Sequence, residues 1–270
     1  MRELRAARRE ARAAVRREVR FAVRREVRAA GMALMFFTRI PIPSLPDFRD
    51  ADLTNAARWF PAVGLLVGGI QAALLWLAAL FLPAAAAARL ALAAGLMLTG
   101  AFHEDGLADS FDGLGGGYSS ARVLEIMKDS RIGTFGAAAL ILALALQAVA
   151  MAELVALPAA NIAAHAASRF AAVTLLATQD YVREDALSRA KPLATRIGPG
   201  GLCWAGACAV APLLFMPWRA AACMLAAMLL ARLWWGHVCQ RRLGGYTGDL
   251  LGACQQLCFT AGLLAAVAAR

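Results

Sequence analysis

Residues 84–117 read AAAAARLALAAGLMLTGAFHEDGLADSFDGLGGG and carry an apolar segment directly into a dense group of acids. The apolar part is close to the length of a membrane-spanning helix, which needs about 20 residues. Four carboxylates follow within nine residues: Glu104, Asp105, Asp109 and Asp112. The last three are spaced i, i+4 and i+7, so a helix would place them on one face. The sequence therefore predicts a membrane helix that leads straight into an acidic helical stretch.

The spacing of these acids indicates a metal site. Three carboxylates on one helix face repel one another, and apolar flanks strengthen the repulsion, so a bound divalent cation is the simplest compensation. Oxygen ligands alone favour Mg²⁺, or Mn²⁺, over zinc. We predict Asp105, Asp109 and Asp112 as ligands. Glu104 is a further, lower-ranked ligand because it points about 100° away from Asp105 on a helix. The competing interpretation is a solvated acidic helix end in a loop between two membrane spans.

Glycines follow the acids and recur near the C-terminus. Residues 113–117, GLGGG, are typical of a helix end and let the backbone approach a bulky ligand closely. We therefore assign Gly115 and Gly116 to substrate binding. Residues 246–249, YTGD, place Asp249 just before another apolar segment. Alone this pattern is typical of a helix N-cap, and beside an acidic site it predicts a substrate contact.

A basic cluster separates the acids from the next apolar segment. In residues 128–133, KDSRIG, Lys128 and Arg131 can clamp a phosphate and Ser130 can donate a hydrogen bond. Asp129 can join a metal site. Alone, these residues are equally typical of a positively charged loop with an N-capping residue. Beside a carboxylate–metal cluster, a cation clamp completes a minimal set of groups for phosphoryl transfer.

The composition is that of a membrane protein. Of the 270 residues, 61% are hydrophobic and 17% are charged, against roughly 25% charged in ordinary domains. We expect an all-α, polytopic membrane helix bundle. The net charge of +10 does not indicate nucleic-acid binding, because residues 1–30, with eleven Arg and four Glu, carry +7 of it. The remaining 240 residues carry only +3, which excludes a basic belt across the body.

The basic start of the chain is predicted to be separate from the membrane domain. We assign residues 1–31 to an Arg-rich N-terminal extension and residues 32–270 to the membrane-embedded domain. The extension repeats AVRREVR at residues 14–20 and 22–28 and lacks the continuous apolar region of a secretory signal peptide. Arg-rich amphipathic helices commonly lie on anionic membrane surfaces, so we expect an interfacial helix. An upstream extension of little consequence is the other interpretation.

About seven apolar segments are candidates for membrane spans. If successive segments form hairpins, the polar stretches at residues 103–133, 179–201 and 240–249 all fall on one side, together with the basic N-terminus. The positive-inside rule places that side in the cytoplasm. We therefore expect a multi-pass protein of the cell inner membrane with its active site facing the cytoplasm. The seven segments are residues 59–82, 84–102, 133–157, 159–178, 202–216, 218–235 and 250–269.

Several side chains inside these segments are polar or contain sulfur. His165 and Arg169 lie one helical turn apart, and lipid would not tolerate either facing outward. They are predicted either to line a cavity or to form a buried structural pair. All six cysteines are in the C-terminal third, and we expect them to act as small buried apolar residues without disulfides. The cysteines are Cys203, Cys208, Cys223, Cys239, Cys254 and Cys258.

Five ordered blocks of residues resemble the cobalamin synthase family, the adenosylcobinamide-GDP ribazoletransferases of late vitamin B12 synthesis. The family pattern H-x-D-G-L-A-D-x-x-D-G-L-G-G-G is matched by residues 103–117, and K-D-S-R-x-G by residues 128–133. The patterns F-x-T-R-I-P, F-P-x-V-G-x-x-x-G and T-G-D-x-x-G-A-x-Q-Q are matched by residues 36–41, 60–68 and 247–256. The resemblance therefore covers nearly the whole chain from about residue 32.

The resemblance implies a Mg²⁺-dependent membrane transferase. In its reaction the ribose hydroxyl of α-ribazole, or of α-ribazole 5′-phosphate, attacks the pyrophosphate of adenosylcobinamide-GDP. GMP leaves, and adenosylcobalamin or its 5′-phosphate forms. The predicted residues suit this chemistry, because a metal on the acidic face would neutralise the diphosphate while Lys128 and Arg131 bind phosphate oxygens. An aspartate, or alternatively His103, would take the hydroxyl proton.

Two departures and two other functions are weighed against this assignment. The first 30 residues have no expected counterpart in the family, and near Phe259 an apolar residue replaces a frequent Glu, which we take as peripheral. A CDP-alcohol phosphotransferase also places aspartates at helical spacing, but its D-G-x-x-A-R motif requires Arg where Ser110 stands. A cation-coupled transporter would show repeated halves and charges near the bilayer midplane, whereas these acids are predicted at a helix end. Besides the two substrates we expect membrane lipid as a partner, and self-association is left open.

Overall fold

The computed structural model describes residues 2–42, 55–182 and 197–270, and these are helical apart from turns, short extended connections and one isolated β-bridge. The predicted all-α fold is therefore confirmed. Most of the predicted polar loop at residues 179–201, and the stretch 43–54, lie outside the described residues. The elements are α1 (Arg2–Phe37), η1 (Ala57–Trp59), α3 (Phe60–Ala79), α4 (Ala84–Thr99), α5 (Phe102–Gly116), α6 (Ser120–Ile126), α7 (Thr134–Glu153), α8 (Pro158–Thr178), α9 (Pro199–Val210), η2 (Ala211–Phe215), α10 (Trp218–Leu243) and α11 (Gly248–Ala268).

Each of the seven predicted segments falls on a helix or a pair of consecutive helices. Among the described residues, four helices are long and apolar enough to cross a membrane: η1 with α3, α7, α10 and α11. The pair α4 and α5 makes a fifth if it counts as one bent span, and α9 with η2 is a shorter apolar helix. The multi-pass helical architecture is confirmed, and the estimate of about seven spans is looser than these four or five.

Helix α8 lies at the centre of the bundle, with 14 of its 21 residues buried. Alanines occupy most of its buried positions, and glycines on α3 face it. A Cβ on Gly64 would lie 2.5 Å from the carbonyl oxygen of His165, and a Cβ on Gly68 would lie 2.9 Å from the Cα of Ile162. Small residues therefore bring the backbones of α3 and α8 into contact, which is how helices associate tightly inside membranes.

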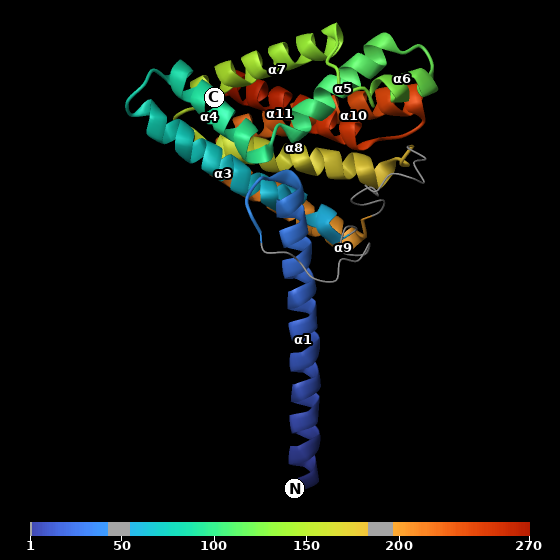
Figure 1. The fold of residues 1–270 in the computed structure, drawn as a ribbon. Coiled ribbons are helices and arrows are strands. Elements are labelled where there is room, and N and C mark those ends of the chain that lie inside the picture. Colours follow the sequence, from blue (N-terminus) through green and yellow to red (C-terminus); the bar gives the residue numbers. More distant parts are fainter. Residues whose placement is uncertain (1, 43–54, 183–196) are drawn as a thin grey trace.

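The segment predicted as a single span over residues 84–102 is broken. Helix α4 ends at Thr99, and α5 leaves it at 89° after Gly100 and Ala101, both of which have left-handed backbone conformations (φ 66° and 57°). The side chain of Arg39 packs against the bend, where a Cβ on Gly100 would lie 2.6 Å from Arg39 Nε. Figure 1 shows α4 and α5 meeting between the two ends of the bundle. The acidic stretch thus begins inside the bundle, which corrects its predicted place at the end of a straight span.

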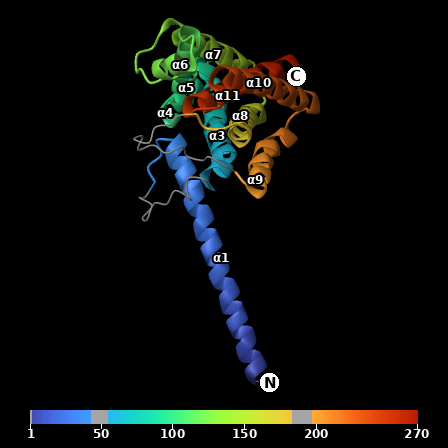
Figure 2. The ribbon, with the colours of Figure 1, turned by 90° about the vertical axis from the view of Figure 1, so that its right-hand side faces the viewer.

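The described polar connections gather at one end of the bundle, as predicted (Figures 1 and 2). Arg242, at the end of α10, donates 2.7 Å to the carbonyl of Gly117, and Ser120 Oγ donates 2.7 Å to the carbonyl of Arg242. After α8, Tyr246 N donates 2.9 Å to the carbonyl of Asp180. These bonds join the α5–α6, α8–α9 and α10–α11 connections into one polar surface.

Helix α1 extends away from the bundle, across the direction of its helices (Figures 1 and 2). Its last turns are the exception, because Met32, Ala33 and Phe37 are buried against α3 and α8. The boundary predicted between residues 31 and 32 therefore falls inside one continuous 36-residue helix. Glu26 fixes the point of contact through Arg58 Nη2 at 2.9 Å and Trp59 Nε1 at 3.3 Å.

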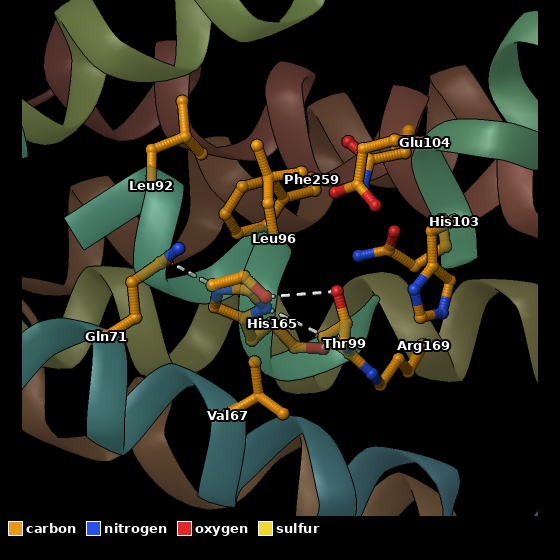
Figure 3. Close-up of a pocket in the computed structure, with 13 residues that line it drawn as sticks. Val67, Gln71, Leu92, Leu96, Thr99, His103, Glu104, His165, Arg169 and Phe259 are labelled. Carbon is orange, nitrogen blue, oxygen red and sulfur yellow. Dashed lines mark hydrogen bonds between the residues drawn. The ribbon is translucent and has the colours of Figure 1, made fainter. Parts of the chain in front are cut away.

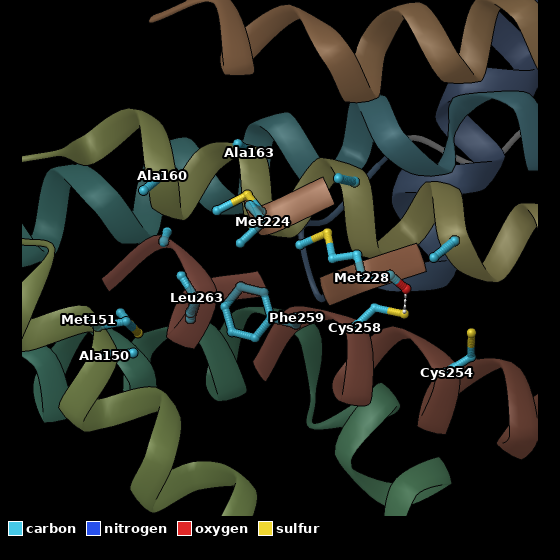
Figure 4. Close-up of a cluster of buried hydrophobic side chains, with 14 of the residues drawn as sticks. Ala150, Met151, Ala160, Ala163, Met224, Met228, Cys254, Cys258, Phe259 and Leu263 are labelled. Atoms are coloured by element: carbon cyan, nitrogen blue, oxygen red, sulfur yellow. Dashed lines mark hydrogen bonds between the residues drawn. The ribbon is translucent and has the colours of Figure 1, made fainter. Parts of the chain in front are cut away.

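The apolar core between α8, α10 and α11 is built from Met, Leu, Ala and Cys side chains (Figure 4). All six cysteines are free, so the predicted absence of disulfides is confirmed. Cys208, Cys239, Cys254 and Cys258 are buried as expected. The prediction was wrong for Cys203 and Cys223, which are exposed because they face outward from the rim helices α9 and α10.

Candidate active site

The predicted acidic face is carried by α5, and its three aspartates differ in exposure. Asp105 is exposed, Asp109 is half-buried and Asp112 is buried. Asp249, at the start of α11, lies beside them, because a Cβ on Gly106 would be only 2.8 Å from the carbonyl oxygen of Asp249. The bare glycine lets the start of α11 rest on α5 between Asp105 and Asp109. The structure therefore brings together two motifs more than 130 residues apart in the chain.

Asp112 holds the N-terminus of α7. Its two carboxylate oxygens accept hydrogen bonds from the backbone N–H groups of Gly133, at 2.7 Å, and Gly136, at 2.8 Å. Backbone N–H groups at a helix start are otherwise unpaired and carry partial positive charge, so a carboxylate stabilises them. Glycine is needed at position 133, where a Cβ would lie 2.5 Å from Asp112 Oδ1. Asp112 thus links the acidic motif to the KDSRIG segment.

The KDSRIG segment is an exposed connection between α6 and α7. Lys128 and Ser130 are exposed, and Arg131 pairs with Asp129 through contacts of 3.0 and 2.6 Å. Hydrogen bonds from Arg131 hold the pKa of Asp129 at about 2, so this carboxylate stays ionised throughout the physiological range. Arg131 remains 86% exposed and open to a ligand. Asp129, predicted as a metal partner, is instead paired with Arg131 in this structure.

The glycines at the end of α5 serve helix packing. A Cβ on Gly115 would lie 2.5 Å from the ring of Phe135, and one on Gly117 would lie 2.6 Å from a methyl group of Val123. Gly116 has more room, because a Cβ there would lie 3.3 Å from Ile126 Cδ1. The predicted helix end at these residues is confirmed, because α5 stops at Gly116. Substrate contact by Gly115 and Gly116 stays a prediction.

His103 and Glu104 face the interior of the bundle and line a small cavity at the α4–α5 bend (Figure 3). His103 is 4% exposed and stacks on Phe37, with ring centroids 5.1 Å apart. Glu104 Oε1 accepts a hydrogen bond of 2.8 Å from Gln256. These two residues were predicted beside the aspartates as catalytic and metal-binding groups, but the helix turns them away from the exposed Asp105.

A network of buried polar side chains continues from this cavity. His165 Nε2 lies 2.7 Å from Gln71 Oε1, and Arg169 Nη1 lies 3.1 Å from His165 Nδ1. Both halves of the prediction for His165 and Arg169 are therefore confirmed, since they contact each other and line the cavity. Phe259, taken as peripheral, also lines it and packs on His165 with centroids 4.4 Å apart. The amides of Gln71, Gln255 and Gln256 were missed, although glutamines inside apolar segments were a visible signal.

Comparison with known proteins decides the family. The family model described as cobalamin-5-phosphate synthase matches residues 29–267. The chain belongs to this family. It is 46% identical to the adenosylcobinamide-GDP ribazoletransferase of Ralstonia pickettii (strain 12J), over 83% of this chain and 89% of that protein. It is 48% identical to the one from Ralstonia nicotianae, over 84% and 89%, and 44% identical to the one from Shewanella sp. (strain W3-18-1), over 84% and 88%. No solved structure matches.

Membership of the cobalamin-5-phosphate synthase family confirms the resemblance drawn from the five motifs. The matched region starts at residue 29, so most of the Arg-rich extension lies outside it. One argument used against a transporter was wrong. Glu104 and Arg169 lie near the middle of the bundle because the acidic helix starts at an internal bend. The family match, rather than the position of the charges, sets the transporter and the CDP-alcohol phosphotransferase aside.

The donor set of α5 fits Mg²⁺ in a restricted way. Within the described residues, no group of three or more His, Cys, Asp or Glu side chains could hold a metal ion. Both oxygens of Asp112 are engaged by backbone N–H groups, which leaves Asp105 and Asp109 as the accessible carboxylates of this helix. Mg²⁺ is commonly held by one or two carboxylates together with substrate phosphates. Asp105 and Asp109 suit that arrangement better than a three-aspartate cage.

Proposed function

We propose that this chain transfers the cobinamide phosphate of adenosylcobinamide-GDP to the ribose hydroxyl of α-ribazole or α-ribazole 5′-phosphate. The products are GMP and adenosylcobalamin or its 5′-phosphate. The observation that carries the proposal is the match, over more than four-fifths of the chain, to relatives named for this activity. The placement of Asp105 and Asp109 near the exposed 128–133 connection supports it, since acids and bases for phosphoryl transfer then lie at one end of the bundle.

Each residue of this polar end has a defined task in the proposed reaction. Asp105 and Asp109 hold Mg²⁺, or Mn²⁺ in its place, which neutralises the diphosphate when bound. Lys128 and Arg131 donate hydrogen bonds to phosphate oxygens, and Arg131 exchanges its bond with Asp129 for one to the substrate. The ribose oxygen forms the new P–O bond as the P–O bond to GMP breaks. An aspartate takes the hydroxyl proton, because His103 is enclosed behind the helix and stacked on Phe37.

We further propose that the polar end faces the cytoplasm from the inner membrane, with α1 lying along the membrane surface. Trp59 and Trp204 form an edge-to-face pair 5.3 Å apart near this end, and tryptophan is enriched at membrane–water interfaces. Glu26 attaches α1 to Trp59 at that level, and α1 runs across the direction of the bundle. Its exposed arginines suit an anionic cytoplasmic leaflet.

The reaction is tested by supplying adenosylcobinamide-GDP and α-ribazole 5′-phosphate to the purified protein in liposomes. We expect GMP and a corrinoid product of higher mass, both followed by chromatography. Removing divalent cations with EDTA should abolish product formation, and adding Mg²⁺ or Mn²⁺ should restore it. Folded protein that gives no GMP with either ribazole acceptor would contradict the proposal. Product formation that is unaffected by EDTA would contradict only the metal.

Substitution of the basic pair should weaken substrate binding. We expect Lys128→Ala and Arg131→Ala each to raise the KM for adenosylcobinamide-GDP about tenfold or more, because a hydrogen bond to a charged group contributes ~1.5–3 kcal/mol. Arg122→Ala is the matched control, since Arg122 is an exposed base on α6 that pairs with Glu125 at 2.8 Å. A KM unchanged in both variants would remove the phosphate clamp from the mechanism.

A further inference from the structure

The cavity at the α4–α5 bend is polar and nearly closed, although it lies among membrane helices. Its lining comes from α3, α4, α5, α8 and α11, and its volume is about 20 Å³. Glu104 and Arg169 bring opposite charges to it, yet they form no salt bridge with each other (Figure 3). Ionisable side chains inside a membrane domain need compensation, so the unpaired charges require an explanation.

Three buried polar atoms on residues that line this cavity have no hydrogen-bond partner within the described part of the chain. They are Glu104 Oε2, Gln255 Oε1 and Arg169 Nε. The other ends of these side chains are already bound: Glu104 Oε1 by Gln256 at 2.8 Å, Gln255 Nε2 to Ser168 at 2.9 Å, and Arg169 Nη1 to the carbonyl of His165 at 3.0 Å. The side chains therefore cannot turn toward new partners without breaking existing bonds.

One water molecule matches this set of atoms. A cavity needs ~10–15 Å³ of such volume to hold a water, and the water needs two to four polar partners. The cavity offers about 20 Å³, two acceptors and one donor. A water can donate to Glu104 and Gln255 and accept from Arg169. A cation would be repelled by Arg169 and an anion by Glu104, so a neutral molecule suits the site best.

We propose that an ordered water joins Glu104, Gln255 and Arg169, and that this water-bridged triad positions the first turn of α5 against α8 and α11. Asp105 directly follows Glu104, and Asp109 lies one turn later, so the triad also sets the direction of the accessible aspartates. This last step rests on the proposed function. The water and its coupling of the two charges do not.

Thermal unfolding tests the coupling without any substrate. We expect Glu104→Gln and Arg169→Gln each to lower the unfolding temperature, because each leaves one charge unbalanced in the interior. The double variant should unfold at a higher temperature than either single variant. The control is the exposed pair Glu153 and Arg270, whose Gln substitutions should have small and additive effects. Additive losses for Glu104 and Arg169 would overturn the coupling.

A structure in lipid nanodiscs at a resolution that shows buried waters tests the site directly. A density peak within hydrogen-bond distance of Glu104, Gln255 and Arg169 is expected, and its absence would overturn the proposed water. Positioning is tested with Gln255→Met, which keeps the size of the side chain and removes the acceptor. We expect kcat to fall by up to ~100-fold while the KM of both substrates stays within about twofold, since misplacing a reacting group by 1 Å can cost this much.

An unchanged kcat in Gln255→Met would overturn the positioning role. The failure of this proposal and of the proposed function are distinguishable. Inactive wild-type protein would refute the reaction, whereas the density peak and the recovery of stability in the Glu104→Gln, Arg169→Gln double variant depend on neither substrate.

Discussion

Asp105→Asn and Asp109→Asn should each lower kcat for cobamide formation by at least ~10²–10³-fold, the usual effect of removing one group that stabilises charge in a transition state. Both aspartates lie on the accessible side of α5, next to the start of α11 and apart from the buried core. Amide side chains have the same size, so the fold should be kept. The measurement is GMP release in liposomes at saturating substrates over a series of Mg²⁺ concentrations.

The matched control for this experiment is Glu125→Gln, which makes the same chemical change on exposed α6. It should leave kcat within about twofold, as expected for a surface pair. Higher Mg²⁺ should partly restore a variant whose only defect is weaker metal binding. Wild-type activity in both Asp105→Asn and Asp109→Asn would refute the assignment of these carboxylates, while leaving the reaction itself intact.

The helices were predictable because apolar runs of about 20 residues and the glycines that end α5 are local signals. The bend between α4 and α5 was not. Gly100 permits a left-handed backbone, but nothing local indicates that Ala101 also adopts one, with φ 57°. Contacts of Arg39 with this bend decide it, and those depend on the tertiary fold. An uninterrupted apolar run consequently predicted one span where the chain makes two helices.

The candidate site was predicted in part for the same reason. Helical spacing correctly put Asp105 and Asp109 on one helix, and motif resemblance brought in the 128–133 segment. Helical geometry also contained a signal that was overlooked, because His103 lies two residues before Asp105 and therefore about 200° around the helix. The partners of Asp112 were beyond sequence reasoning, since Gly133 and Gly136 reach it only through the packing of α7 on α5.

Asp112→Ala should lower the free energy of unfolding by ~3 kcal/mol, because it removes two hydrogen bonds to a charged group and leaves two backbone N–H groups at the start of α7 unpaired. Asp112→Asn should cost about half as much, since the amide oxygen can accept from one glycine while its NH₂ group faces the other. The measurements are thermal unfolding in detergent and hydrogen–deuterium exchange over residues 128–136, where both variants should exchange faster.

Gly136→Ala tests the same contact while keeping all three aspartates. Its Cβ would lie 2.8 Å from the carbonyl oxygen of Ala108 and would also overlap the carboxylate of Asp112, so it should reproduce the loss of stability. Gly69→Ala is the matched control, because no atom of the described residues lies within 4 Å of its Cβ position. If Asp112→Asn lost activity but unfolded like the wild type, Asp112 would act as a metal ligand instead. Equal destabilisation by Asp112→Asn and Gly136→Ala would assign it to holding α7, so that the acidic helix and the phosphate-binding segment move as one unit.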